Sequence, residues 1–482
     1  KCTILKNLAC ADGLSHRCGH EQAVARNIMA EGGDERIDLP GWPGHVWLEG
    51  RTLVHMQEEQ ERPTHMPRGP AKRTGPGFLN PAMAPARTRS VMLLADALEH
   101  DWLVKADRPI RALDALCATG VRIRRWRNEI PGPLQQRLRI TANDLDEFAL
   151  AWAATSHELH PPSTPVEHEA EDDRHGQKSS AVFDNGLHFQ RLDARMAMVD
   201  AAYQWVDLDP FGSPIQFLDA ALQSLSRTGV LEVTATDTAA LTGSSASSQA
   251  RRYQAKGIVD EYAHDDAVRL LVGTVATTAA RLDKVVTPLL ALFDGHHVRI
   301  SLLVRTSKSE ATAIGKSIGW RVRTEGVPYQ FVQHPTPEQL PNASGPLWIG
   351  PLWHKDIAGR MTEARALELC SPSAEEITEY QKAGLVWGDD DIEYSGRELR
   401  RSVRYIAQAA DLMSREHLLL NLDALPRLAG VGGAPKMDKL LESLAEMGHA
   451  AARYPDLEPM LVTDAPFDDV IQAVKNARDS TD

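Results

Sequence analysis

Apolar residues between positions 109 and 233 occur in short runs, and amphipathic stretches separate these runs. The runs predict buried strands at residues 110–113, 138–142, 188–192, 205–208 and 230–234. Two of the stretches between them have helical spacing, one around Val121, Ile123 and Trp126 and one over residues 147–157. Strands that alternate with helices form βαβ units, so the pattern predicts an α/β fold with a mostly parallel sheet.

After about residue 306 the pattern changes, and it predicts a separate α+β domain. Residues 373–383 have helical spacing behind a capping-type start, in which Ser371 and Ser373 precede Glu375 and Glu376. Residues 398–414 predict a longer amphipathic helix, and residues 418–448 predict two more helices around a glycine-rich loop at 430–435. The polar side of the longer helix carries Arg400, Arg401 and Arg404, which either contact nucleic-acid phosphates or are simply solvated.

Composition narrows the class of protein. The 482 residues are 43% hydrophobic and 25% charged, which is ordinary for a globular protein, and no apolar run reaches the roughly 18 residues that span a bilayer. The five cysteines are sparse and form no CxxC pair, which favours a reduced, cytoplasmic setting. Near the amino terminus Cys10, His16, Cys18 and His20 match no standard zinc-finger spacing, so we expect a poorly ordered extension there rather than a metal site.

The net charge of −13 argues against indiscriminate binding of nucleic acid, but one stretch is locally basic. No acidic residue occurs from Arg62 to Ala95, and proline and glycine punctuate its first part, so an extended loop is expected. This stretch is either a solvated linker or an arm that contacts phosphates. Its basic residues are Arg62, Arg68, Lys72, Arg73, Arg87 and Arg89.

One predicted strand ends in a group of side chains suited to chemistry on a planar amine. The apolar run that ends at Leu208 is followed by Asp209, Pro210 and Phe211, and a proline stops a strand because it cannot donate to the ladder. Open α/β sheets place ligands at this end of their strands. The ring of Phe211 can stack on a flat base, and the carboxylate of Asp209 can accept a proton from an exocyclic amine. An ordinary strand-to-loop turn is the alternative.

Two other strand ends and the first strand's turn predict a cofactor site. Residues 114–122 place an acid, small residues and then a helix start in sequence, but they contain one glycine where a dinucleotide motif needs three. A nucleoside without phosphates fits better, and S-adenosylmethionine is such a ligand. Asp144 follows the second strand, where a carboxylate commonly binds ribose, and Asp193 with Ala194 follows the next, where an acid commonly reaches adenine. Each acid could instead be only a helix cap.

The chain resembles the tRNA guanine-26 N2-dimethyltransferases, archaeal type, from about residue 49 to about residue 466. The resemblance rests on several motifs that occur in the family's order: residues 78–83 with Arg87, residues 113–122, residues 207–214, residues 233–239, residues 252–253 with 261–264, residues 345–352 and residues 463–466. The Asp-Pro-Phe-Gly motif at residues 209–212 is highly specific when the others accompany it.

The resemblance implies a Rossmann-like methyltransferase domain that uses S-adenosylmethionine, followed by an α+β domain that binds tRNA. It implies domain limits of 1–48 for an amino-terminal extension, 49–305 for the methyltransferase domain with insertions near 57–75 and 161–180, and 306–482 for the carboxyl-terminal domain. Asp209 is the expected catalytic carboxylate, and Phe211 and Phe78 would sandwich the extruded guanine. The expected cofactor contacts are Arg87 and Arg122 to the carboxylate end, Asp144 to the ribose, and Asp193 and Ala194 to the adenine.

The chain departs from the family pattern in one respect that bears on metals. Many members carry a four-cysteine zinc site in the carboxyl-terminal half, where this chain has only Cys370, so we expect no metal. Two other functions stay open: an amino methyltransferase acting on adenine in DNA or ribosomal RNA, and a noncatalytic RNA-binding relative. We expect tRNA as partner and a monomer in the cytoplasm.

Overall fold

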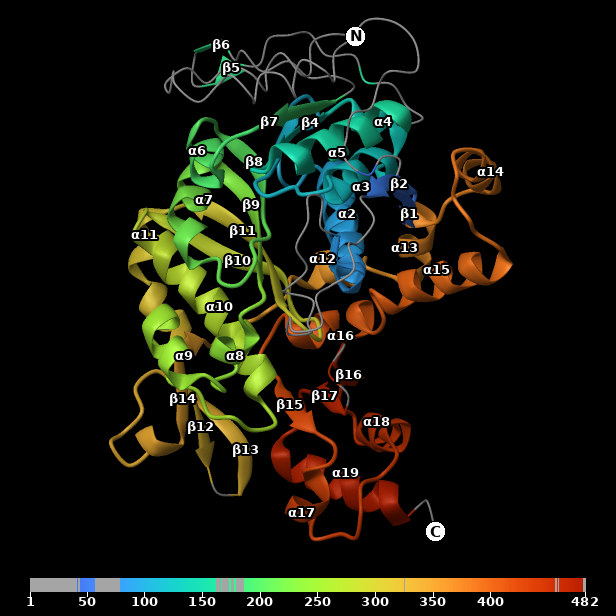
Figure 1. The fold of residues 1–482 in the computed structure, drawn as a ribbon. Helices are drawn as coiled ribbons and strands as arrows, with labels where there is room; N and C mark the ends of the chain where they lie inside the picture. Colours follow the sequence, from blue (N-terminus) through green and yellow to red (C-terminus); the bar gives the residue numbers. More distant parts are fainter. Residues whose placement is uncertain are drawn as a thin grey trace, which may run out of the picture. The chain divides into compact units, whose positions relative to one another are not determined.

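The computed structural model describes residue 41 and residues 44–56, 79–161, 166, 173–174, 177–178, 186–324, 326–455, 457 and 459–479, and Figure 1 labels its elements. The chain divides into two compact units. Unit 1 comprises Lys1–Asp209, Gln223–Gly229 and Ala366–Ser402, and unit 2 comprises Pro210–Leu222, Val230–Arg365 and Val403–Asp482. The domain limits expected from the sequence stay predictions.

The largest sheet of the described chain has seven strands. They are β3 Ile110–Asp114, β4 Leu138–Asn143, β7 Leu187–Gln190, β8 Tyr203–Leu208, β9 Leu225–Ala235, β10 Lys284–Phe293 and β11 Val298–Thr306. Their order is β10-β11-β9-β8-β3-β4-β7. In unit 1, β3 pairs in parallel with β4 and β8, and β4 pairs in parallel with β7. In unit 2, β10 pairs antiparallel with β11. The α/β fold with its parallel strands is confirmed.

The position of β3 in this order predicts where a ligand binds. The chain leaves β3 toward β4 on one side and later returns to β8 on the other side, so the strand order reverses at β3. Open parallel sheets bind ligands outside the carboxyl ends of the strands at such a reversal. The site is therefore expected at Asp114 and at the residue after Leu208, where β3 and β8 end.

Helices of unit 1 connect these strands. Between β3 and β4 lie α3 Val121–Glu129 and the short α4 Gly132–Gln135, and after β4 comes α5 Glu147–Leu159. The side chain of Asp146 caps α5 by accepting hydrogen bonds from Phe148 N and Ala149 N. Trp126 on α3 and Trp152 on α5 are almost fully buried, so these helices supply much of the unit's core. The other helices are η3 Pro81–Met83, α2 Ala84–Glu99, α6 Ala194–Val199, part of α13 Glu363–Cys370, α14 Ala374–Lys382 and α15 Asp389–Arg401.

A small hairpin of unit 1 packs on its α14 segment. The hairpin consists of β1 His45–Glu49 and β2 Thr52–Met56, paired antiparallel. Leu48 and Leu53 of the hairpin form an apolar cluster with Ile377 and Leu385. The start of α14 is a capping box, because Ser373 Oγ accepts from Glu376 N while the Glu376 carboxylate accepts from Ser373 N. This cap is the one that the sequence predicts.

Unit 2 contains the rest of the large sheet and two three-stranded sheets. Its helix α10 Ala263–Ala280 packs along β10, as Figure 1 shows. One small sheet has the order β13-β12-β14, from β12 Ile318–Thr324, β13 Val327–Val332 and β14 Ala343–Trp348. Its other helices before residue 403 are η4 Ile215–Phe217, most of α7 Leu218–Ser224, α8 Thr238–Leu241, α9 Ala246–Tyr253, α11 Lys308–Thr312, η5 Ile314–Ser317, η6 Leu340–Asn342 and α12 Lys355–Gly359.

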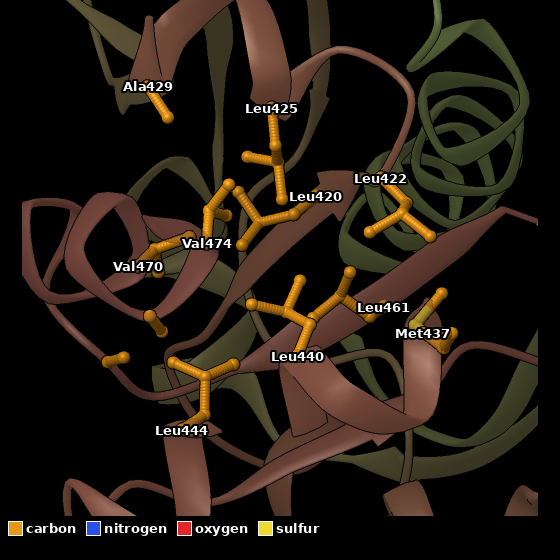
Figure 2. Packing of buried hydrophobic residues seen from close by; sticks show 12 residues of the cluster. Leu420, Leu422, Leu425, Ala429, Met437, Leu440, Leu444, Leu461, Val470 and Val474 are labelled. Carbon is orange, nitrogen blue, oxygen red and sulfur yellow. The ribbon is translucent and has the colours of Figure 1, made fainter. Parts of the chain in front are cut away.

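Described residues of unit 2 between 420 and 474 form a hydrophobic core around the sheet β15-β17-β16. The elements are α16 Ile406–Met413, β15 Leu418–Asn421, α17 Leu425–Ala429, α18 Met437–Glu446, β16 Ala451–Arg453, β17 Met460–Thr463 and α19 Phe467–Asp479. Figure 2 shows Leu420 and Leu461 of the sheet against Leu440 and Val474 of the helices. Burying each large aliphatic side chain contributes about 1.5–3 kcal/mol of transfer free energy, and these contributions stabilise the packing of the helices on the sheet.

Two sequence predictions in this half are wrong. Residues 398–414 do not form one helix, because α15 ends at Arg401 and α16 begins at Ile406, with Tyr405 between them in the left-handed conformation at φ 67°. Leu418–Asn421 is a strand rather than the start of a helix, since its apolar run pairs with β17.

A third correction concerns the basic stretch. Arg87 and Arg89 lie in the helix α2 and are 4% and 2% exposed, so neither belongs to an extended arm. Residues 86–98 of α2 are all buried, and Arg89 Nη1 donates to Ser402 O at 2.8 Å. Arg62, Arg68, Lys72 and Arg73 lie outside the described residues, as do the candidate zinc ligands near the amino terminus and most of the predicted insertions. None of the helices in the described part of the chain is long and apolar enough to cross a membrane.

Candidate active site

The loop after β8 carries the predicted catalytic residues. Asp207 inside β8 is fully buried, whereas the side chain of Asp209 just beyond the strand is 17% exposed. Phe211 is 67% exposed, which is unusual for so large an apolar side chain. Gly212 adopts φ 77°, and its N–H donates to Thr236 Oγ1 at 2.7 Å while its carbonyl accepts from Thr236 N at 2.9 Å. The backbone of unit 2 is thus fixed at Gly212, directly after the exposed ring of Phe211.

Arg122, in the first turn of α3, binds the Asp209 carboxylate directly. Its Nη2 donates to Asp209 Oδ2 at 2.6 Å. Its Nε lies 3.3 Å from Asp207 Oδ1 and 3.9 Å from Asp114 Oδ2. Its Nη1 is buried and has no hydrogen-bond partner in the described structure. The guanidinium therefore fixes the orientation of Asp209 and keeps one donor that a ligand can use.

The turn between β3 and α3 is held by neighbouring strand ends. Ala115 N donates to Asp207 O at 3.1 Å, and Cys117 N donates to Asn143 O at 2.8 Å. Asn143 Nδ2 donates to Ala115 O at 2.9 Å and to Leu192 O at 3.0 Å, and its Oδ1 accepts from Leu192 N. The buried amide thus ties together the loops that follow β3, β4 and β7. The sequence analysis assigned Asn143 no role, although its position beside Asp144 at the end of a predicted strand could have indicated one.

Asp144 follows β4 and faces the same turn. Its Oδ2 accepts from Ala118 N at 2.8 Å, and its Oδ1 accepts from Asp146 N at 2.9 Å. Burial raises the pKa of Asp144, while these backbone hydrogen bonds lower it. A carboxylate has about four acceptor positions, and the backbone amides of Ala118, Leu145 and Asp146 use three of them, so one remains for a hydroxyl group.

Asp193 caps α6 after β7, and Ala194 begins that helix. Asp193 accepts three hydrogen bonds from Arg195, one from its N–H at 2.9 Å and two from its guanidinium at 2.9 and 2.8 Å. These bonds lower the pKa of Asp193 to about 2. Ala194 is buried. Asp193 therefore acts at least as a helix cap, the alternative that the sequence left open.

Arg87 lies in a buried ion network of unit 1. Its Nε and Nη2 donate to the two oxygens of Glu49 at 2.6 and 2.5 Å, and Nη2 also donates to Asn80 O at 2.9 Å. Burial opposes the ionised form of Glu49, but Arg87 and Arg125 outweigh it and lower the pKa of this carboxyl. The Nη1 atom of Arg87 takes part in none of these hydrogen bonds. Phe78, the predicted second stacking ring, lies outside the described residues.

A second polar cluster, in unit 2, joins the sequence motifs at residues 233–239 and 252–253, whose contact the sequence did not predict. Tyr253 Oη donates to Asp237 Oδ1 at 2.7 Å and lies 3.2 Å from Ser213 Oγ, and Arg252 Nη1 donates to Asp237 Oδ2 at 3.0 Å. Burial, followed by the charge of Asp237, raises the pKa of Tyr253. Ser213 follows the Asp-Pro-Phe-Gly motif directly, so this cluster anchors the loop after the motif.

We predict that Gly120→Ala destabilises the protein more than an ordinary glycine replacement. Gly120 has φ 70°, and an added Cβ would lie 2.8 Å from Ala153 Cβ. The left-handed conformation costs about 1–2 kcal/mol and the clash about 1–3 kcal/mol more. Gly430→Ala is the matched control, since Gly430 has φ 68° and nothing lies within 4 Å of the added atom. Urea denaturation measures both variants, and equal losses would contradict the prediction.

Among the described residues, no group of three or more His, Cys, Asp or Glu side chains could hold a metal ion. The carboxylates of Asp114, Asp144 and Asp193, at three strand ends, instead accept hydrogen bonds from backbone amides or a guanidinium group. Their chemistry suits the hydroxyl groups and amines of an organic ligand.

Comparisons with known proteins agree on one family. A family model described as N2,N2-dimethylguanosine tRNA methyltransferase matches residues 54–380. The tRNA (guanine(26)-N(2))-dimethyltransferase of Thermococcus kodakarensis is 30% identical over 403 residues, which cover 83% of this chain and 93% of that protein. The enzyme of the same name from Pyrococcus furiosus is 29% identical over 400 residues, with 83% and 93% covered.

A solved structure has the same fold. It is the structure of Trm1 from Pyrococcus horikoshii in complex with S-adenosyl-L-methionine, and it superposes with a TM-score of 0.62 at 23% identity. The match covers 89% of this chain and 99% of that one.

Proposed function

The chain belongs to the N2,N2-dimethylguanosine tRNA methyltransferase family, and we propose that the strand-end cluster at Asp209 is where it methylates the exocyclic N2 amine of guanine 26 in tRNA. The reaction uses S-adenosylmethionine and gives N2-methyl- and N2,N2-dimethylguanosine. The observation that carries the proposal is the half-exposed loop after β8, in which a carboxylate held by Arg122 precedes an exposed phenyl ring.

The side chains at the strand ends fit the cofactor. Asp144 keeps an acceptor position for a ribose hydroxyl. Asp193 and Ala194, at the start of α6, would contact the adenine. Arg122 Nη1, buried and without a described partner, fits the carboxylate of the amino-acid end. Arg87 can assist only through Nη1, because Glu49 and Asn80 engage its other nitrogens. S-adenosylmethionine supplies an electrophilic methyl group on its sulfonium.

Asp209 acts on the amine. The lone pair of guanine N2 is delocalised into the ring, so the nitrogen is a poor nucleophile. A hydrogen bond from N2–H to Asp209 draws electron density toward the nitrogen, and the carboxylate takes the proton as the N–C bond forms. Arg122 holds the Asp209 carboxylate in place through the 2.6 Å contact. An acceptor that tolerates a monomethylated amine also serves the second transfer.

Phe211 stacks on the guanine, and we predict that Phe211→Ala lowers kcat/KM for tRNA by about 5- to 150-fold, since base stacking is worth about 1–3 kcal/mol. The side chain is 67% exposed, so its loss leaves the fold intact. Phe211→Tyr keeps a ring of the same width and should retain most activity. Steady-state methylation with varied tRNA measures both variants. Equal activity of Phe211→Ala and the wild type would remove Phe211 from the site.

Labelled methyl transfer into two tRNA substrates tests the function. One substrate carries guanine at position 26, and the other carries inosine there, which lacks the exocyclic amine but keeps the rest of the base. We expect N2-methyl- and N2,N2-dimethylguanosine in the first and no label in the second. N6-methyladenosine in the nucleoside digest would instead favour the adenine alternative.

We further propose that the enzyme acts in the cytoplasm. The sparse cysteines support this compartment, since Cys117 and Cys370 are both free thiols and buried. The exposed Arg400, Arg401 and Arg404 support a contact with tRNA phosphates.

A further inference from the structure

Three carboxylates share one guanidinium beneath the proposed cofactor site. Asp114 comes from β3, Asp207 and Asp209 come from β8 and the residue after it, and Arg122 comes from α3. The side chains of Asp114, Asp207 and Arg122 are 3%, 0% and 5% exposed, so water screens their charges weakly. Asp209 holds the shortest of the three contacts, at 2.6 Å, and Asp114 holds the longest, at 3.9 Å.

Asp114 is the member of this cluster best placed to hold a proton. Arg122 is the cation that faces it, and Leu116 N donates to its Oδ1 at 3.3 Å. The carboxylates of Asp207 and Asp209 oppose its charge, and Cys117 in the adjoining turn is a buried neutral thiol. Burial, followed by the charge of Asp207, raises the pKa of Asp114 to about 8, although Arg122 lowers it.

The carboxylate of a ligand would be a fourth acidic group around the same guanidinium. Arg122 Nη1 is the donor left for it. The ammonium on the same end of the ligand offsets one negative charge, but the site still gathers Asp114, Asp207, Asp209 and the ligand carboxylate around one guanidinium in a poorly solvated place. An ionised Asp114 would raise the cost of docking the carboxylate, because like charges at this depth repel strongly.

We propose that Asp114 is a proton-holding positioning residue, whose neutral form is the one that lets the cofactor's carboxylate dock on Arg122. The inference rests on the proposed function of Arg122 as the carboxylate ligand. It makes cofactor binding a proton-linked event: the bound state holds the Asp114 proton more tightly than the free state does. Arg122 can then bind Asp209 and the cofactor carboxylate without a competing ionic attraction to Asp114.

The sign of the pH dependence follows from this linkage. Below about pH 8 Asp114 is protonated in the free protein, and the affinity does not change through this group. Above about pH 8 the free protein must take up a proton to bind, so affinity falls by up to about tenfold per pH unit.

Calorimetry with two ligands and two proteins tests the proposal. S-adenosylhomocysteine carries the amino-acid carboxylate, and 5′-methylthioadenosine keeps the nucleoside but lacks it. Each is titrated into the wild type and into Asp114→Asn from about pH 6 to about pH 9, in buffers of different ionisation enthalpy, which report proton uptake. Asparagine has the shape of the protonated acid and no proton to lose. The ammonium group of S-adenosylhomocysteine titrates equally with both proteins, so it cancels in their comparison.

We expect proton uptake and loss of affinity above pH 8 only for S-adenosylhomocysteine with the wild type, beyond what Asp114→Asn shows. Identical pH profiles for the two proteins would overturn the inference while leaving the proposed function in place. If Asp114→Asn does not fold, equal pH profiles of the two ligands with the wild type, after correction for the ligand ammonium, would overturn it in the same way. If S-adenosylhomocysteine does not bind the wild type at any pH, the proposed function fails instead.

Discussion

Asp209→Asn should lower kcat for tRNA methylation by about 10²- to 10⁴-fold, the range that a positioned general base contributes. Asparagine has nearly the same shape, and its carbonyl oxygen can still accept from Arg122, which donates to Asp209 at 2.6 Å in the wild type. It cannot take the proton from N2. The affinities for tRNA and for S-adenosylhomocysteine should therefore change little, which places the loss in the chemical step.

Single-turnover methylation with saturating tRNA measures this effect, and calorimetry measures the affinities. Asp389→Asn is the matched control. Asp389 is exposed in the first turn of α15, distant in sequence from the Asp-Pro-Phe-Gly motif, and its replacement removes the same charge as Asp209→Asn. A kcat for Asp209→Asn within a few-fold of the control would show that Asp209 is not the base.

Arg122→Met should destabilise unit 1 by about 3–5 kcal/mol, the cost of breaking a buried ion pair by removing one partner. Asp114 and Asp207 would stay buried without the guanidinium that lies 3.9 and 3.3 Å from them. Without Arg122, which lowers the pKa of Asp114, these carboxyls hold protons to higher pH in the folded state, whereas the unfolded chain loses them above about pH 4. The stability of Arg122→Met should therefore fall as the pH rises from about 5 to 8.

Urea denaturation at several pH values checks this prediction. Arg195→Met is the control, since Arg195 and Asp193 pair at 2.8 Å but are 57% and 37% exposed, and an exposed pair contributes about 1 kcal/mol or less. Equal destabilisation of the two variants, or a pH-independent loss for Arg122→Met, would contradict the account of the cluster.

The strands that build the site were predictable from the sequence because each is an apolar run bounded by turn residues. β3 and β4 begin at the predicted residues, Ile110 and Leu138, and β8 ends at Leu208 before Pro210. Helix capping was also predictable, because its partners are close in sequence, as in the capping box of Ser373 and Glu376. The placement of Asp209 just after a buried strand follows from the pattern alone.

What depends on distant partners was not predictable. Arg122 and Asp209 are 87 positions apart in the sequence, and nothing in either segment indicates that they bind each other. Glu49 likewise pairs with Arg87 across 38 positions, which turns a residue of an apparently basic stretch into a buried ion pair. The break at Tyr405 was missed because the amphipathic spacing continues on both sides of it.

The central claim is that the Asp209 carboxylate faces the exocyclic amine of the target guanine. A structure of this chain with S-adenosylhomocysteine and a tRNA that has guanine at position 26 tests it most directly, through the distance from the Asp209 oxygens to N2 of that base. We predict a hydrogen bond of about 2.7–3.2 Å, with the guanine stacked on Phe211. A guanine whose N2 lies beyond hydrogen-bond reach of Asp209, and is held by another side chain, would contradict the account.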